Sequence, residues 1–168
     1  QLPLFNGSTI TNLNQIEKYL ENTKQKKNLN KYIGGLFKAK HKTHQVLIDI
    51  KEPPQKNLSK CYQSGPLSFE YFLDGLKIVS NSGFGVNISK KAETLSRLTA
   101  CQSTLTLNDT SVTKFEKNEL INKVFGNSIQ NSFKFYDLKT KNENALIGCS
   151  ATNNGYEKKF GCTHRREI

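Results

Sequence analysis

Two short runs with a two-residue period lie near the end of the chain, and they constrain its fold more than any other feature. Residues 133–138 alternate phenylalanine with lysine and tyrosine, and after the polar stretch 139–144 a more apolar run covers 145–150. Such alternation is typical of a half-buried strand, so the two runs predict an antiparallel hairpin. Residues 43–50 also alternate, and the prolines that follow cannot donate to a strand ladder. The sequence therefore predicts an antiparallel sheet of four or five strands.

One segment has the spacing of an amphipathic helix. Between residues 69 and 79, apolar side chains recur at intervals of three and four residues: Phe69, Phe72, Leu73, Leu76 and Val79. This spacing predicts the main helix, packed against the sheet. Weaker patterns predict a helix after Asn12, a short helix in 91–101, a strand in 104–107 and a helix that begins with a capping box at Thr113 and Glu116. The expected fold class is α+β.

Length and charge limit the organisation and the partners. A chain of 168 residues fits a single domain, and we expect a core over 61–168 with a helix–strand extension over 1–60. The chain carries 25 Lys and Arg against 14 Asp and Glu, a net charge of +11. This excess attracts polyanions such as nucleic acid, acidic membrane surfaces or acidic glycans. No run approaches the roughly 18 apolar residues that cross a bilayer, so membrane insertion is not expected.

The cysteines indicate the compartment. Cys61, Cys101, Cys149 and Cys162 are far apart and form no CxxC pair. Zinc sites normally need closely spaced Cys or His ligands, so neither a metal nor another cofactor is expected. Two disulfides in an oxidising compartment are the prediction. Together with a chain that opens at Gln1, this predicts a secreted monomer, with delivery into host cells left open.

Three groups of side chains are candidates for chemistry. His41 and His44 flank the start of the strand predicted at 43–50, and imidazole titrates near neutral pH, so either could serve as a general base beside Glu52. Lys134 and Tyr136 share one face of the predicted hairpin, where an ammonium group and a stacking ring could meet one ligand. The third group is the basic tail, which could contact a phosphate backbone: Lys158, Lys159, His164, Arg165 and Arg166. For each group, an ordinary solvent-exposed face is the alternative interpretation.

The C-terminal part, residues 61–168, resembles the fungal guanyl-specific ribonucleases and ribotoxins, and the ribonuclease-like effectors that powdery mildew fungi secrete. The likeness lies in 133–137, in 145–148, and in Gly161-Cys162-Thr163 near the end. It implies a ribonuclease-like fold in which Lys134 stands at the family's arginine position and Thr152 at its catalytic histidine position. It also implies the disulfides Cys61–Cys162 and Cys101–Cys149.

The resemblance implies a function without catalysis. Threonine cannot act as an acid on a leaving alkoxide at neutral pH, so the expected protein is a virulence effector that binds a host protein, such as an immune receptor, or RNA. The contact residues implied are Lys134, Tyr136, Thr152, Arg165 and Arg166. The alternative is an active ribonuclease that uses His44, Glu52 and Lys134. A third class, a secreted glycan- or surface-binding protein, fits the charge equally well.

Overall fold

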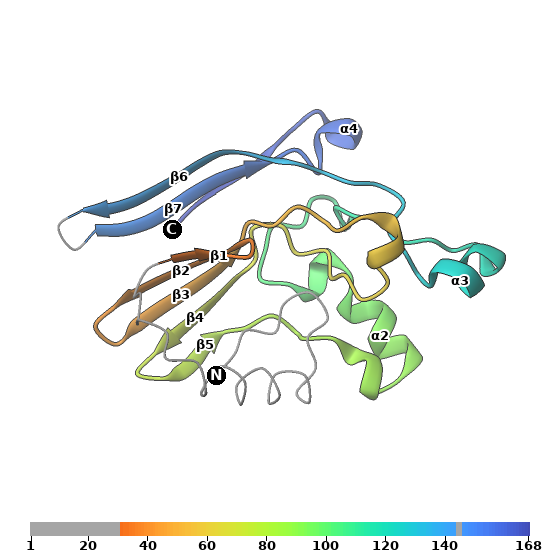
Figure 1. Cartoon of the computed structure of the whole chain (residues 1–168), viewed down its shortest axis with the longest axis horizontal. Helices are drawn as coiled ribbons and strands as arrows, with labels where there is room; N and C mark the ends of the chain where they lie inside the picture. The colour runs from red at the N-terminus through yellow and green to blue at the C-terminus, as the bar shows by residue number, and fades with distance from the viewer. Residues whose placement is uncertain (1–30, 144–145) are drawn as a thin grey trace.

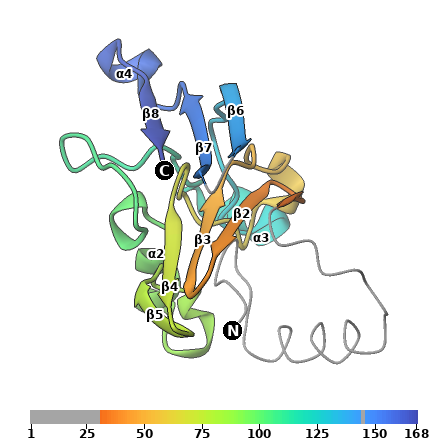
Figure 2. The same cartoon turned by 90° about the vertical axis from the view of Figure 1, so that its left-hand side faces the viewer.

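The computed structural model describes residues 31–143 and 146–168, and these residues form two antiparallel β-sheets that pack face to face (Figure 1). The larger sheet has the strand order β1-β2-β3-β4-β5, so each strand pairs with its neighbour along the chain. Its strands are β1 (Lys31–Ile33), β2 (Leu36–His41), β3 (His44–Asp49), β4 (Phe69–Leu73) and β5 (Leu76–Val79). The smaller sheet, in which β7 lies between its two partners (Figure 2), consists of β6 (Phe135–Glu143), β7 (Leu146–Asn153) and β8 (His164–Glu167).

The helices are short and lie in the connections between strands. The helices α2 (Lys90–Ser96) and α3 (Glu119–Phe125) lie at the end of the molecule opposite the β2–β3 turn (Figure 1). The single-turn helix α4 (Glu157–Phe160) connects β7 to β8, and three 3-10 turns complete the set: η1 (Lys56–Leu58), η2 (Gly85–Asn87) and η3 (Thr99–Cys101). Within the described ranges, no helix has the length and apolar character needed to cross a bilayer.

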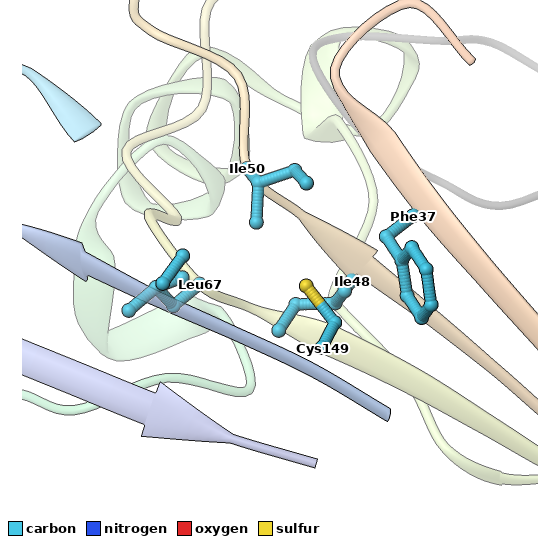
Figure 3. Close-up of a cluster of buried hydrophobic side chains, with 6 residues drawn as sticks. Phe37, Ile48, Ile50, Leu67 and Cys149 are labelled. Carbon is cyan, nitrogen blue, oxygen red and sulfur yellow. The ribbon is translucent and has the colours of Figure 1, made fainter. Parts of the chain in front are cut away.

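The main hydrophobic core fills the space between the two sheets. Phe37, Ile48 and Ile50 come from the larger sheet and the residue after it, and they meet Cys149 and Ala151 of β7 (Figure 3). Ile48 and Ala151 have no exposed surface. Burying a side chain of the size of isoleucine contributes about 1.5–3 kcal/mol, so this layer holds the sheets together. A second cluster lies under the loops and contains Tyr62, Val112, Ile129, Phe133 and Tyr156.

The prediction of a main helix over 69–79 is wrong. These residues form the hairpin of β4 and β5, with Leu73 paired to Leu76 across a two-residue turn. The turn residues Asp74 and Gly75 have φ angles of 50° and 80°, and positive φ at both central residues defines the tight turn that Asp-Gly favours. Aromatic side chains at Phe69 and Phe72 favour strands, so the helical spacing of the apolar residues was coincidental.

The other elements were predicted with mixed success. The hairpin near the C-terminus is confirmed, although its strands continue through most of the polar stretch 139–144 that was expected to be a turn. The strand over 43–50 is confirmed as β3, and α2 lies within the expected helix 91–101 but for its first residue. The helix predicted after Thr113 exists as α3, but Asn118 caps it. The strand over 104–107 is wrong, and the helix after Asn12 lies outside the described residues.

The ribonuclease-like α+β fold and its two disulfides are also wrong. All four cysteines are free, and Cys149, which the prediction paired with Cys101, is buried between the sheets as a small apolar side chain. Cys162, the expected partner of Cys61, is exposed. A sheet packed on a sheet replaces the expected sheet packed on a helix, because the supposed main helix supplies two strands instead. The division into a core and an N-terminal extension stays a prediction.

Candidate functional site

Two neighbouring clefts lie beside α3, at the end of the molecule that carries the helices. The first, called the Lys60 cleft, has a volume of about 640 Å³ and is lined by Lys60, Cys61, Phe84, Val86, Lys90, Glu93, Glu119, Asn122, Lys123, Gly126 and Asn127. The second, called the Glu116 cleft, has a volume of about 840 Å³ and is lined by Thr94, Arg97, Leu98, Asp109, Thr110, Ser111, Thr113, Lys114, Phe115, Glu116, Lys117, Asn122, Asn127 and Gln130. Asn122 and Asn127 line both clefts, so the two share a wall.

The Lys60 cleft combines ammonium groups with apolar surface. Lys90 makes a 2.9 Å ion pair with Glu93, and its side chain is 76% exposed. Lys60 and Lys123 are both exposed, and neither makes an ion pair with any residue that the structure describes. Exposed cations without a protein partner are available to an anionic ligand, and Val86 adds apolar surface beside them.

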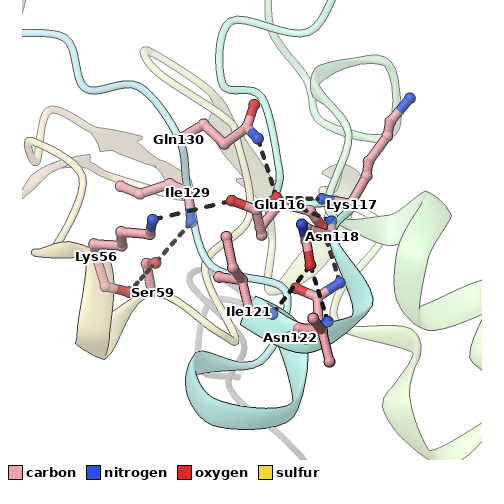
Figure 4. Close-up of polar contacts among 10 residues, drawn as sticks. Lys56, Ser59, Glu116, Lys117, Asn118, Ile121, Asn122, Ile129 and Gln130 are labelled. Carbon is pink, nitrogen blue, oxygen red and sulfur yellow. Dashed lines mark hydrogen bonds and ion pairs between the residues drawn. The ribbon is translucent and has the colours of Figure 1, made fainter.

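The Glu116 cleft is built around a buried carboxylate (Figure 4). Oε1 of Glu116 accepts hydrogen bonds from the backbone N–H groups of Lys117, at 3.0 Å, and Asn118, at 2.9 Å. It also accepts one from Nε2 of Gln130, at 3.3 Å. The hydrogen bond from Asn118 is the main reason that the pKa of this carboxyl is lowered, and the ammonium group of Lys56, 4.0 Å from Oε2, adds to the effect. Glu116 therefore stays ionised near neutral pH.

Capping residues determine where α3 begins and ends, and one side chain of the helix fixes it to Glu116. Oδ1 of Asn118 accepts from the N–H groups of Leu120 and Ile121, which is the usual role of an N-cap residue. Gly126 ends the helix with a φ of 67°. Asn122, in the middle of the helix, donates from Nδ2 to the carbonyl of Glu116 at 3.2 Å. The helix and the carboxylate are thus fixed to each other, so the wall between the clefts is preorganised.

Arg97 is a buried residue that positions the chain around the clefts. It is only 1% exposed, and its guanidinium donates from Nε to the carbonyl of Tyr62 at 2.9 Å and from Nη2 to the carbonyl of Ser59 at 2.8 Å. The ring of Phe115 lies 4.1 Å from the guanidinium carbon. Burial lowers the pKa of Arg97 to about 10, so it remains charged at neutral pH. Arg97 therefore holds the chain around Ser59–Tyr62 against the end of α2 and positions the residues that line the clefts.

The residues expected to bind a partner lie elsewhere, on the smaller sheet or next to it. Lys134, Tyr136 and Arg165 are exposed there, and Arg165 lies 3.6 Å from Glu167 in a surface ion pair. Thr152 is buried in β7, 5% exposed. Arg166 is half-buried and donates to the carbonyls of Leu67 and Ser103, so it fastens β8 to the rest of the fold (hydrogen bonds of 2.7 and 2.8 Å). A binding role for these side chains stays a prediction.

The alternative catalytic residues are not brought together. His44 lies at the start of β3, where Nδ1 is 2.7 Å from the hydroxyl of Tyr71, and His41 faces it across the hairpin. Glu52 follows the other end of β3, and Lys134 precedes β6. A strand of six residues is about 20 Å long, so Glu52 is out of reach of either histidine. Among the described residues, no group of three or more His, Cys, Asp or Glu side chains could hold a metal ion.

Sequence reasoning identified Glu116 as a helix-capping acid and missed Lys60, Arg97 and Lys123. Lys60 and Lys123 form no recognisable motif in the sequence, because they are 63 residues apart and only the fold brings them to one cleft. A signal was present at α3, where Asn118 before the helix and Gly126 after it mark a short capped element. Arg97 could not be recognised because its burial depends on contacts with Ser59 and Tyr62.

Two solved structures share the fold of this chain. The chain is similar in structure to a mutant of the heparan sulfate lyase HepC from Pedobacter heparinus, with 18% identity and a TM-score of 0.66 over 100% of this chain and 27% of that one. It is also similar to a heparinase III with methylated lysines, with 16% identity and a TM-score of 0.60 over 99% of this chain and 26% of that one. The chain thus spans about a quarter of each solved relative, and both relatives are enzymes. No curated protein matches the chain in sequence.

These comparisons overturn the resemblance to fungal ribonucleases, and with it the effector function and the host-protein or RNA partner. The resemblance rested on a C-terminal hairpin and a cysteine near the end. A hairpin of this kind also occurs in folds made of two packed sheets, as it does here. Thr152 accordingly does not mark the place of a lost histidine. The family model described as "Heparinase II/III-like, C-terminal" matches residues 31–168. The chain therefore belongs to the Heparinase II/III-like, C-terminal family.

Proposed function

We propose that this domain is the β-rich part of a polysaccharide lyase-type protein, and that it binds an acidic polysaccharide of the heparan sulfate class in the clefts beside α3. The family match supports a carbohydrate ligand, and one of the solved relatives is a heparan sulfate lyase. The chain spans about a quarter of those relatives, so we propose both the lyase-type activity of the whole protein and its polysaccharide substrate. A secreted location, predicted from the sequence, would bring the protein to such a polysaccharide and stays a prediction.

The observation that carries this proposal is the set of lysines in the Lys60 cleft. Lys60 and Lys123 are exposed and make no ion pair among the described residues, and Lys90 pairs only at the surface. Sulfate and carboxylate groups recur along an acidic polysaccharide, so several of them can meet these ammonium groups at once. The net charge of +11 favours the encounter at a distance.

We assign the clefts a role in binding and orientation. Eliminative cleavage of a uronic acid chain requires a group that removes the proton beside the carboxylate and another that protonates the leaving oxygen. The residues that line the two clefts include neither histidine nor tyrosine. Glu116 is a weak base because its pKa is lowered. The lysines of the clefts are suited to hold an acidic sugar, and the two linings lack the histidine and tyrosine side chains that could exchange its protons near neutral pH.

A charge-neutralising pair of substitutions tests the proposal. In the K60Q/K123Q variant we expect the affinity for heparan sulfate to fall about tenfold, since each ammonium–sulfate contact at an exposed site contributes up to about 1 kcal/mol. The control is K139Q/K141Q, which removes the same number of charges from exposed positions of β6. We expect this control to lower the affinity less than about threefold. Isothermal titration at a fixed salt concentration measures both.

Three results would count against the proposal. They are the absence of heparan sulfate binding by the wild-type chain, equal losses in the two variants, and equal binding of a neutral polysaccharide such as dextran. RNA at matched charge serves as a further competitor, because a purely electrostatic surface would bind both polyanions alike.

A further inference from the structure

One oxygen of the Glu116 carboxylate, Oε2, accepts no hydrogen bond from any residue that the structure describes. Oε1 already accepts three hydrogen bonds, from Lys117, Asn118 and Gln130. The nearest charged partner of Oε2 is the ammonium group of Lys56, at 4.0 Å, which is too far for a hydrogen bond, and the Lys56 side chain is 52% exposed (Figure 4). Glu116 lines the cleft and is only 9% exposed, and we call this buried part of the lining the floor of the cleft.

The floor therefore offers one hydrogen-bond acceptor, Oε2 of Glu116. Asn122 lines the same cleft, but its Oδ1 has no exposed surface and adds no acceptor that a ligand could reach. Arg97 contributes a positive charge to this wall, and its Nη1 has no hydrogen-bond partner among the described residues, but that nitrogen has no exposed surface and the ring of Phe115 lies over the guanidinium. Arg97, at 1% exposure, is therefore less accessible to a ligand than Glu116, at 9%.

The exposed part of the lining, which we call the rim, carries two lysines and one carboxylate, Asp109. Lys114 and Lys117 line the cleft and are exposed, whereas Glu116 between them in the sequence is buried. An acidic sugar can thus place its anionic groups beside the lysines at the rim. The part of the sugar that faces the floor must then lie beside the fixed negative charge of Glu116.

We propose that Glu116 is a specificity-determining residue, which accepts a hydrogen bond from a hydroxyl or amino group of the sugar and disfavours a sulfate at the same position. This inference rests on the proposed binding of an acidic polysaccharide. A carboxylate in a partly buried site repels an anion within a few ångströms, because little water is present to screen the two charges. An amino group is attracted for the same reason.

The test compares E116Q with wild type in binding a heparin hexasaccharide and the same hexasaccharide after N-desulfation, which carries free amines. Glutamine keeps the accepting Oε1 and removes the charge, so the fold should persist, and thermal unfolding checks this. We expect E116Q to shift the ratio of the two affinities toward the fully sulfated sugar by about five- to tenfold. The matched control is D109N, an exposed carboxylate on the same cleft. It should shift the ratio less than about twofold.

The possible results separate the two proposals. Equal shifts in E116Q and D109N, or no shift in either, would overturn the role of Glu116 and leave the binding of acidic sugars intact. Failure of the wild-type chain to bind either hexasaccharide would overturn both.

Discussion

His164 shows how far the environment of a single residue can depart from its sequence context. It lies in a basic tail that suggested a solvent-exposed phosphate contact, yet it is 6% exposed at the start of β8. Its Nδ1 is 3.3 Å from the amide nitrogen of Asn153, and an amide nitrogen can only donate, so Nδ1 accepts. Burial, with a smaller contribution from Arg166, lowers the pKa of His164 to about 4. Residues 164–167 show no apolar alternation, so β8 could not be predicted.

This shift predicts a pH dependence of stability. Between pH 6.5 and pH 4 the unfolded chain protonates His164 and the folded chain does not, so the free energy of unfolding falls as the pH falls through this window. From pH 7 to pH 5 the loss should be about 2 kcal/mol. Burial also raises the pKa of Asp49 to about 7, and this makes the free energy of unfolding rise as the pH falls. Wild type is therefore compared with the H164N variant, in which the contribution of Asp49 is the same. Urea unfolding at each pH should show that wild type loses stability relative to H164N, and parallel curves would contradict this.

The segment over 69–79 shows why the larger elements were only partly predictable. Its apolar residues fit both a helix and a hairpin: Phe69, Phe72 and Leu76 recur at intervals of three and four residues, whereas Phe69, Tyr71 and Leu73 recur at every second residue. The deciding signal was Asp74-Gly75, a dipeptide that favours a two-residue hairpin turn. By contrast, the alternation in 133–138 and 43–50 fits only a strand, and both predictions are confirmed.

The sign of the stability change caused by Gly75→Ala distinguishes a helix over 69–79 from the hairpin. In a helix interior, Gly75→Ala would stabilise the protein by up to about 1 kcal/mol. In the observed turn, where φ is 80° and no atom lies within 4 Å of the added methyl, the substitution should destabilise it by about 1–2 kcal/mol through backbone strain alone. D74N is the control, because asparagine tolerates positive φ, and it should be nearly neutral. Stabilisation by Gly75→Ala in denaturant unfolding would contradict the hairpin.

At the scale of the whole molecule, the packing of the two sheets determines where a ligand can bind. The main hydrophobic core lies between the two sheets, and the polar clefts lie at the end where the connections carry α2 and α3. The positive charge of the chain predicted a polyanionic partner, and acidic glycans were among the classes it allowed. The position of the site could not be predicted, because the clefts bring together residues between Lys60 and Gln130 that only the tertiary fold places side by side.

The most direct test of the account is a hydrogen–deuterium exchange footprint of the full chain with and without a heparan sulfate hexasaccharide. Binding in the clefts beside α3 should slow amide exchange in residues 84–97 and 113–130, because the ligand excludes water and restricts the opening of these elements. Exchange in the β2–β3 hairpin and in β6 should not change. Protection confined to that hairpin or to β6, with none around α3, would contradict the account.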